Sequence, residues 1–286
     1  MSQVNPYILA TDIGGSHITS AIVNTTDWSI VADCVTRNRV DSSSDAKSIF
    51  HAWASNLQET ISKSPEQVSQ LGIAMPGPFD YENGISLMHN QDKYDSLYQL
   101  DTTIGLHEAL KETLLDIRYI NDAAAFLQGE VFASRLDHNE VILGVTLGTG
   151  LGSAVWRKGE KAFDADLWNT PYRDSIFEEY MVTRWFTRRF EELTGHKVDG
   201  LKEILENHRE EKAFDTLMTA YSEQLLDFMG FFSEKHQCTQ FIIGGNIAKA
   251  LDIITTYNPQ GFERYTIGTS NLDEKAAIIG AASIFQ

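Results

Sequence analysis

An apolar segment that is interrupted by a glycine-rich turn and then resumes occurs twice in this sequence, and this repeat limits the possible folds most. Residues 7–12 form an apolar, strand-like segment, residues 13–17 (IGGSH) interrupt it, and strand-like sequence resumes at Ile18. The same order of strand, turn and strand returns in residues 141–156. This repetition predicts two related lobes that face each other across a cleft. A length of 286 residues is sufficient for two such lobes.

The remaining segments alternate between strand and helix patterns, which predicts the α/β class. Further strands are expected at residues 71–75, 117–120 and 241–243. Helices are expected at residues 123–133, 213–234, 247–251 and 273–285. Ser175 and Glu178 have the spacing of a capping box, so another helix is expected to begin there.

The first turn differs from both common nucleotide-binding motifs. A dinucleotide fold has three spaced glycines that open a helix, whereas the chain after Gly14 and Gly15 continues as a strand. The lysine-containing P-loop motif is absent from the sequence. Both motifs are therefore excluded.

The charge balance restricts the class of partner. The sequence has 23 Lys and Arg against 40 Asp and Glu, a formal net charge of −17, and it lacks the basic cluster that a nucleic-acid backbone needs, so we expect no nucleic acid. It has no run of about 18 apolar residues and opens without a signal peptide, so we expect a cytoplasmic protein with no membrane segment. Cys34 and Cys238 alone cannot build a disulfide framework or a cysteine-rich zinc site.

Asp12 stands at the end of the first expected strand, directly before the Gly14–Gly15 turn. Backbone N–H groups at glycines can approach an anion closely, and the Ser16 hydroxyl can add a donor. A carboxylate there would repel phosphate unless a cation lay between them, so Asp12 is a candidate Mg²⁺-side group. The alternative is a tight hairpin in which Asp12 is only a turn residue, and this turn taken alone favours that alternative.

The second turn has more polar groups than a hairpin needs. Gly148, Gly150 and Gly152 stand together with Thr146 and Thr149 in seven residues. Threonine hydroxyls and bare amides form a neutral cradle for a β- or γ-phosphate. This turn therefore favours phosphate binding.

Two further sites are ambiguous on residue chemistry alone. Asn121 and Asp122 stand where a strand passes to a helix, and Asp122 can cap that helix or act as a general base that accepts a hydroxyl proton during phosphoryl transfer. Gly244, Gly245 and Asn246 also join a strand to a helix. They can hold an adenosine moiety at the helix N-terminus, or they can form a turn with no ligand. Both pairs of alternatives stay open at this point.

Five motifs together resemble the ROK family of sugar kinases and related repressors, within the actin, hexokinase and Hsp70 superfamily. In chain order, they are Asp12–Ser16 (DIGGS), Pro76–Pro78 (PGP), Asn121–Ala123 (NDA), Leu147–Gly152 (LGTGLG) and Ile243–Asn246 (IGGN). Their order and spacing extend the resemblance over nearly the whole chain. It implies a two-lobed, actin-like ATPase fold of the ribonuclease H type with a central cleft. The lobes would be residues 1–120 with 273–286, and residues 121–272.

The same resemblance implies a role for each motif. Asp122 would be the catalytic base, Asn121 would hydrogen-bond the sugar, and Pro76 and Gly77 would approach the sugar from the other lobe. ATP phosphates and Mg²⁺ would be held by the first turn (Asp12, Gly14, Gly15, Ser16) and the second turn (Thr146, Gly148, Thr149, Gly150). The third turn (Gly244, Gly245, Asn246) would lie beside the adenosine. A homodimer is also implied.

One segment departs from the family pattern. After the second phosphate turn, family members have a Glu-x-Gly-His run and clustered cysteines that bind sugar and a structural zinc, whereas the matching position here reads Asp166–Asn169 (DLWN). Neither His nor Cys occurs between residues 161 and 185, so we predict no structural zinc. Asp166 and Asn169 are the candidate sugar-binding residues, because a shorter carboxylate and an amide still form hydrogen bonds.

These observations lead to two hypotheses of different classes. Asp122 together with both phosphate turns favours an ATP-dependent kinase for a hexose or amino sugar. We do not expect the repressor branch, because the first strand begins by Tyr7 and leaves no room for a helix-turn-helix before it. The altered Asp166 and Asn169 positions favour instead a non-catalytic protein that responds to a sugar or nucleotide.

Overall fold

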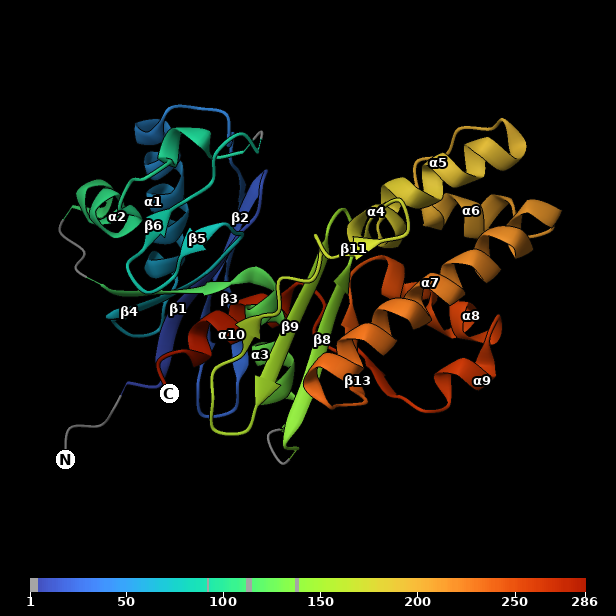
Figure 1. The fold of residues 1–286 in the computed structure, drawn as a ribbon. Helices are drawn as coiled ribbons and strands as arrows, with labels where there is room; N and C mark the ends of the chain where they lie inside the picture. The colour runs from blue at the N-terminus through green and yellow to red at the C-terminus, as the bar shows by residue number, and fades with distance from the viewer. Residues whose placement is uncertain (1–4, 92, 112–114, 137–138) are drawn as a thin grey trace. The chain divides into compact units, whose positions relative to one another are not determined.

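The repeat expected from the sequence corresponds to two sheets with the same strand arrangement. A computed structural model describes residues 5–91, 93–111, 115–136 and 139–286. The first sheet contains, in spatial order, β3 (Ser29–Arg39), β2 (His17–Asn24), β1 (Tyr7–Ile13), β4 (Gln70–Met75) and β7 (Asp116–Asn121). β1 pairs antiparallel with β2 through the first turn, whereas β4 and β7 run parallel to β1 (Figure 1).

The second sheet repeats this plan. Its strands, in spatial order, are β10 (Phe163–Asp164), β9 (Leu151–Arg157), β8 (Val141–Leu147), β13 (Gln240–Gly244) and β14 (Thr266–Thr269). β8 pairs antiparallel with β9 through the second turn, and β13 and β14 run parallel to β8. The predicted α/β class and the internal repeat are therefore confirmed. The strands expected at residues 71–75, 117–120 and 241–243 are β4, β7 and β13.

The chain divides into two compact units. Unit 1 contains residues 1–138, 159–163 and 274–286, and unit 2 contains residues 139–158 and 164–273. The lobes predicted from the family resemblance change at residue 121 instead, which would assign the helix after β7 to the second lobe. That lobe boundary stays a prediction, and the units below are those of the structure.

Unit 1 packs its helices on the first sheet. They are α1 (Ala46–Ser62), α2 (Thr102–Leu110), α3 (Asp122–Ala133) and α10 (Lys275–Ser283), with the short η1 (Asp95–Leu97) and the small hairpin β5 (Phe79–Asp80) and β6 (Ile85–Ser86). α10 contacts α3, β1 and β4, so the end of the chain completes the unit that the first strand begins. The apolar core of this unit includes Trp53 and Leu71.

Unit 2 has a larger helical layer. It contains α4 (Phe177–Met181), α5 (Thr183–Thr194), α6 (Leu201–Asn207), α7 (Lys212–His236), α8 (Leu251–Thr256) and α9 (Pro259–Phe262). Its remaining elements are η2 (Ile247–Ala250) and the hairpin β11 (Pro171–Tyr172) and β12 (Ser175–Ile176).

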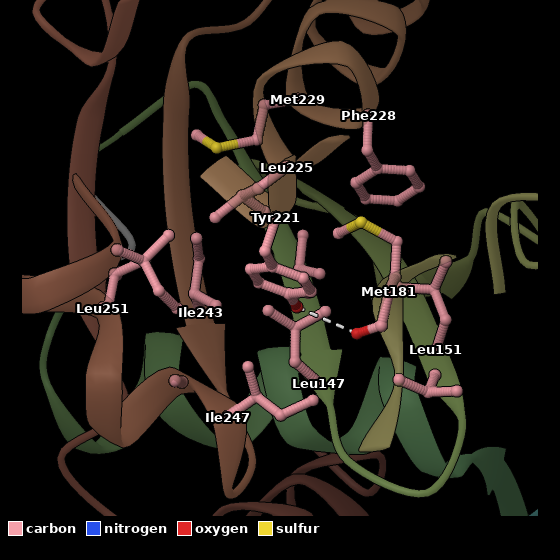
Figure 2. Close-up of a cluster of buried hydrophobic side chains, with 14 of the residues drawn as sticks. Leu147, Leu151, Met181, Tyr221, Leu225, Phe228, Met229, Ile243, Ile247 and Leu251 are labelled. Carbon is pink, nitrogen blue, oxygen red and sulfur yellow. Dashed lines mark hydrogen bonds between the residues drawn. The ribbon is translucent and has the colours of Figure 1, made fainter. Parts of the chain in front are cut away.

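The core of unit 2 positions two of its glycine turns. Figure 2 shows Tyr221 of α7 among Leu147 and Leu151, which flank the second turn, and Ile243, which precedes the third. The Tyr221 hydroxyl donates a hydrogen bond of 2.9 Å to the Met181 carbonyl oxygen. Because these side chains are buried in the core, they fix the second and third turns, whereas Thr149 and Gly245 within those turns are exposed.

Two local expectations from the sequence are corrected. The capping box at Ser175 and Glu178 is wrong, because Ser175 pairs with Tyr172 in a hairpin and α4 begins at Phe177 without a side-chain cap. The helix expected at residues 247–251 begins as the 3₁₀ turn η2 and continues as α8. The helices expected at residues 123–133, 213–234 and 273–285 are α3, α7 and α10.

The structure bears on the expected lack of a membrane segment, but it does not describe the first four residues of the chain. Met1–Val4, part of the segment in which we expect no signal peptide, lie outside the described residues. Among the helices that the structure does describe, none combines the length and apolar character needed to cross a bilayer.

The close contact of α3 with α10 depends on glycine at two positions. A Cβ atom at Gly129 would lie 1.9 Å from the Ala276 carbonyl oxygen, and one at Gly280 would lie 1.8 Å from the Ala125 carbonyl oxygen. The two helix backbones therefore touch, which a side chain at either position would prevent.

We predict that Gly280→Ala destabilises the protein by about 1–3 kcal/mol or more, because the added methyl group must push two backbones apart. Urea unfolding measures this loss. Gly230→Ala in α7 is the matched control, since its Cβ would meet no backbone atom outside its own helix within 4 Å and would approach only side-chain ends, Arg264 Nη2 at 3.3 Å and the Tyr265 hydroxyl at 3.6 Å. That variant should be neutral or stabilised by up to about 1 kcal/mol. Equal stability of the two variants would contradict the close contact.

Candidate active site

The first turn is held by hydrogen bonds at Gly14 and is exposed to solvent at Gly15 and Ser16. The Gly14 N–H donates to the His17 carbonyl oxygen at 2.9 Å, and the buried Tyr94 hydroxyl donates to the Gly14 carbonyl oxygen at 2.6 Å. Gly15 and Ser16 are exposed. The backbone geometry therefore leaves this turn accessible to an anion. Sequence reasoning missed Tyr94, because no motif surrounds it.

Asp12 lies at the carboxyl end of β1 in an acidic setting. Its side chain is half-buried. Burial, then the nearby charges of Asp122 and Glu274, raise the pKa of Asp12 from 3.8 to about 7, and Arg37 opposes this rise. Arg37 also forms an ion pair of 2.7 Å with Glu274. The site therefore holds more negative than positive charge.

This charge excess fits a bound Mg²⁺ ion. Mg²⁺ keeps several waters and takes one or two protein carboxylates together with substrate phosphates. Asp12 can be one such carboxylate, since burial and then the charges of Asp122 and Glu274, which raise its pKa, disfavour its charged form unless a cation is bound. Within residues 5–91, 93–111, 115–136 and 139–286, no three His, Cys, Asp or Glu side chains are grouped as metal ligands. A Mg²⁺ ion here would thus depend on phosphate oxygens and water.

Asn121, rather than Asp122, caps α3. The Asn121 Oδ1 atom accepts hydrogen bonds from the Ala123 and Ala124 N–H groups at 2.9 and 3.1 Å. The Asp122 side chain is exposed, and its Oδ1 accepts from the Ala123 N–H at 2.8 Å. The capping role considered for Asp122 therefore belongs mainly to Asn121.

The electrostatic setting of Asp122 favours proton uptake. Although solvent reaches the side chain, the surrounding protein limits hydration of the carboxylate and raises its pKa. The Ala123 N–H group and the Lys93 charge oppose this rise. A carboxylate with a raised pKa is a better proton acceptor than one in bulk water.

The sheet topology brings the other predicted residues of unit 1 to the same edge. Parallel pairing aligns Asp12 with Ala74, and Met75 with Asn121, so β1, β4 and β7 end together. The Asn121 Nδ2 group donates to the Tyr81 hydroxyl at 3.2 Å, and that hydroxyl donates to the Met75 carbonyl oxygen at 3.1 Å. Ligands of α/β proteins commonly bind at the carboxyl ends of parallel strands.

The Pro76–Gly77 turn lies beside Asn121 through the same tyrosine. A Cβ atom at Gly77 would lie 3.4 Å from the Tyr81 hydroxyl. Asp12, Gly77, Asn121 and Asp122 are thus gathered in unit 1. Tyr81 is a second residue that the sequence motifs did not indicate.

The second turn, in unit 2, has both a carboxylate, Glu178, and a guanidinium group, Arg184, beside it. The Thr183 N–H group and hydroxyl both donate to the Gly148 carbonyl oxygen, at 2.9 and 3.0 Å, and a Cβ atom at Gly148 would meet nothing within 4 Å. Glu178 accepts a hydrogen bond from the Leu151 N–H at 3.0 Å and pairs with Arg184 at 2.8 Å. The turn is open, but a carboxylate lies beside it.

Thr146 and Thr149 complete the second turn. Thr146 is half-buried near the end of β8, and Thr149 is exposed. The Thr149 carbonyl oxygen accepts from Arg184 Nη1 at 3.3 Å. Arg184 thus contacts the turn directly, and sequence reasoning missed it as well.

The third turn borders a cavity of about 320 Å³ in unit 2. Its lining includes Gly244, Gly245, Lys249, Asp252 and Thr269. Gly245 has a φ of +90°, and a Cβ atom there would lie 2.3 Å from the Leu147 carbonyl oxygen, so glycine is required. Register pairing of Gly244 with Thr146 places this turn beside the second one.

Asn246 differs from its neighbours in the third turn. It does not line the cavity, and its Oδ1 atom accepts from Lys249 Nζ at 3.2 Å. A second cavity of about 650 Å³ lies over α4, α5 and α7. Its lining includes Arg173, Arg188 and Gln224 but none of the catalytic or ligand-binding residues predicted from the sequence.

In the segment that departs from the family pattern, Asp166, Trp168 and Asn169 are exposed and Leu167 is buried. Asp166 has a φ of +51°, and its Oδ1 accepts from the Trp168 indole N–H at 2.8 Å. Asn169 is exposed. The adjacent hairpin is held by stacking of Tyr172 on Phe177, with ring centroids 4.4 Å apart. Aromatic packing therefore stabilises this region.

Solved structures share this two-sheet α/β fold. A ROK family glucokinase from Streptomyces griseus, in complex with glucose and AMPPNP, superimposes with a TM-score of 0.74 at 18% identity over 97% of this chain and 98% of that one. A Listeria monocytogenes protein proposed to be an N-acetylmannosamine kinase superimposes with a TM-score of 0.78 at 19% identity over 98% of both chains. The expected fold class is thereby confirmed.

The family follows from the sequence comparison. The model of the ROK family matches residues 8–163, more than half of the chain, and this protein belongs to the ROK family. An N-acetyl-D-glucosamine kinase from Mannheimia succiniciproducens is 23% identical over 273 residues, covering 84% of this chain and 79% of that protein.

We predict that Asp12 makes the folded protein less stable as pH rises. Its pKa is higher in the folded chain than its ordinary value of 3.8, so its favourable contribution is complete below about pH 4 and is lost as pH approaches 7. Melting temperatures of wild type and Asp12→Asn across pH 4–8 test this, and the variant should gain relative to wild type toward pH 8. Asp27→Asn is the control, because hydrogen bonds from Ser29 lower the pKa of Asp27. An unchanged difference between wild type and Asp12→Asn across this range would contradict the prediction.

Proposed function

We propose that this protein transfers the γ-phosphoryl group of ATP to a hydroxyl group of a hexose or amino sugar. The observation that supports this most is the Asp122 carboxylate, which is exposed at the start of α3 and has a raised pKa. It lies at the same sheet edge as Asp12 and the first glycine turn. General bases need this combination of access and proton affinity.

The reaction balances through this carboxylate. The sugar hydroxyl oxygen forms a bond to the γ-phosphorus while the bond from that phosphorus to the β,γ-bridging oxygen breaks, and ADP leaves. The hydroxyl proton passes to Asp122. Asn121 holds the first turn of α3, so it is the residue that fixes where the Asp122 backbone lies.

The nucleotide is proposed to use all three glycine turns. Gly14, Gly15 and Ser16 would bind phosphate in unit 1, and Thr146, Gly148, Thr149 and Gly150 would bind phosphate in unit 2. Gly244 and Gly245 would border the adenosine, which the cavity of about 320 Å³ supports. Asn246 would act through its neighbour Lys249. When bound beside Asp12, Mg²⁺ neutralises phosphate charge during the transfer.

The acceptor is proposed to be a sugar for two reasons. The names of the similar proteins refer to glucose, N-acetylglucosamine and N-acetylmannosamine. Pro76, Gly77 and Asn121 lie at the end of the same sheet as Asp122 in unit 1, and Asp166 and Asn169 provide exposed hydrogen-bonding groups in unit 2. A homodimer, a cytoplasmic location and the lack of a structural zinc stay predictions of the sequence.

A second candidate is a non-catalytic protein that responds to a sugar or nucleotide. The observation that favours it is the bond between Asp166 and the Trp168 indole, which occupies one oxygen of the candidate sugar ligand. A thermal-shift screen of sugars and nucleotides followed by a coupled ADP-release assay separates the two. Binding without ADP release would favour this second candidate.

We predict that Asp122→Asn lowers kcat by about 10²–10⁴-fold, the usual contribution of a general base. The amide keeps the size of the side chain but cannot accept the hydroxyl proton at neutral pH. ADP release in a panel of hexoses and N-acetyl amino sugars measures the loss.

The matched control is Asp116→Asn, which changes an exposed carboxylate on β7 of the same unit. It should keep wild-type kcat, and both variants should keep the wild-type melting temperature within a few degrees. Full activity of Asp122→Asn would show that another group accepts the proton.

A further inference from the structure

Lys93 lies over the first glycine turn. A Cβ atom built on Gly15 would lie 3.8 Å from the Lys93 Cδ atom, so the aliphatic part of the lysine lies beside this glycine, where a side chain would just touch it. The next residue, Tyr94, is buried and bonds the Gly14 carbonyl oxygen. The Tyr94 N–H group donates to the Ser42 carbonyl oxygen at 2.8 Å. The backbone that bears Lys93 is therefore attached to the turn itself.

The Lys93 ammonium group also acts on the carboxylate of Asp122. Its charge lowers the pKa of Asp122, against the limited hydration of the carboxylate, which raises it. Lys93 is half-buried. Among the described residues, its ammonium group has neither a hydrogen-bond partner nor an ion-pair partner within 4.0 Å. A half-buried cation is normally paired, so this one has capacity for a ligand.

The charged groups near Lys93 indicate which kind of ligand its ammonium group can bind. Asp12, Asp122 and Glu274 are negative, and Arg37, paired with Glu274, and Lys93 are positive. An anion entering beside Asp122 would meet two carboxylates that repel it. Lys93 is the unpaired positive group within reach of both Gly15 and Asp122 among the described residues. A phosphate group is the anion that a glycine turn with an adjacent ammonium group binds.

We propose that Lys93 binds the terminal phosphate of ATP over the Gly14–Gly15 turn and stabilises the phosphoryl group while it passes to the acceptor. This inference rests on the proposed function for its chemical step. In that step the ammonium group keeps its protons and donates hydrogen bonds to non-bridging oxygens of the γ-phosphoryl. The acceptor oxygen bonds to phosphorus, the bridging oxygen leaves with ADP, and Asp122 takes the hydroxyl proton.

The binding part of this proposal is tested without turnover. Isothermal titration calorimetry measures the Kd of Mg²⁺–AMPPNP and of Mg²⁺–ADP for wild type, Lys93→Met and Lys93→Arg. Lys93→Met should weaken AMPPNP binding by about tenfold or more, the loss of one charge-assisted contact, and should change ADP binding by less than about twofold. Lys93→Arg should recover most of the AMPPNP affinity. Equal losses for both nucleotides, or no loss for either, would overturn the proposal.

The catalytic part is tested by steady-state kinetics. Lys93→Met should lower kcat for sugar phosphorylation by about 10²–10³-fold, as expected when one donor to the transition-state charge is removed. Since the lysine also lowers the pKa of Asp122, the acid limb of the kcat/KM profile should move to higher pH in Lys93→Met and stay in place in Lys93→Arg. Lys47→Met, an exposed lysine on α1, is the control and should match wild type.

The two proposals fail in different ways. If wild type releases no ADP with any sugar, the proposed kinase function is wrong, and the calorimetric comparison of AMPPNP with ADP still decides the role of Lys93. If wild type is active and Lys93→Met retains its kcat and pH profile, the role of Lys93 in transfer is wrong and the kinase function stands.

Discussion

The candidate base in unit 1 depends on a direct contact between two helix backbones. α3 begins at Asp122 and packs on α10 through Gly129 and Gly280, and α10 in turn packs on β1 and β4. β7, which ends at Asn121, is in register with β4. The start of α3 is therefore fixed both by the sheet and by the last helix of the chain. A carboxylate on a helix held this closely can keep one position while substrates bind and leave.

The charged residues near the carboxyl ends of β1 and β7 affect one another's protonation, so their roles depend on one another. Asp12, Asp122 and Glu274 place negative charge where a triphosphate would bind, and limited hydration of the carboxylates raises the pKa of both Asp12 and Asp122. Such an arrangement costs stability in the empty protein and is relieved by cations, a pattern common at functional sites. A divalent ion beside Asp12 and the ammonium group of Lys93 would supply that relief on two sides of the phosphate.

The fold was more accessible to sequence reasoning than the details of the site. The repeated strand, turn and strand pattern predicts both sheets, because glycine turns and apolar strands are local signals. Tyr81, Lys93 and Tyr94 follow the Pro76–Pro78 motif but belong to no motif themselves. Only the folded chain brings Tyr81 to Asn121, and Lys93 and Tyr94 to the Gly14–Gly15 turn. Local spacing also gave the wrong start for α4, since hairpin pairing of Ser175 with Tyr172 outweighed its capping propensity. The cap of α3 is Asn121, one residue before the position that the sequence offered, because its Oδ1 atom accepts from the Ala123 and Ala124 N–H groups.

The central claim is that the Asp122 carboxylate faces the hydroxyl group that receives phosphate. A crystal structure with Mg²⁺, AMPPNP and N-acetylglucosamine measures this most directly. The account predicts a sugar hydroxyl oxygen within about 2.6–3.2 Å of an Asp122 carboxylate oxygen, with the terminal phosphate on the far side of that hydroxyl. A bound sugar whose hydroxyl groups all lie beyond hydrogen-bonding distance of Asp122 would contradict it.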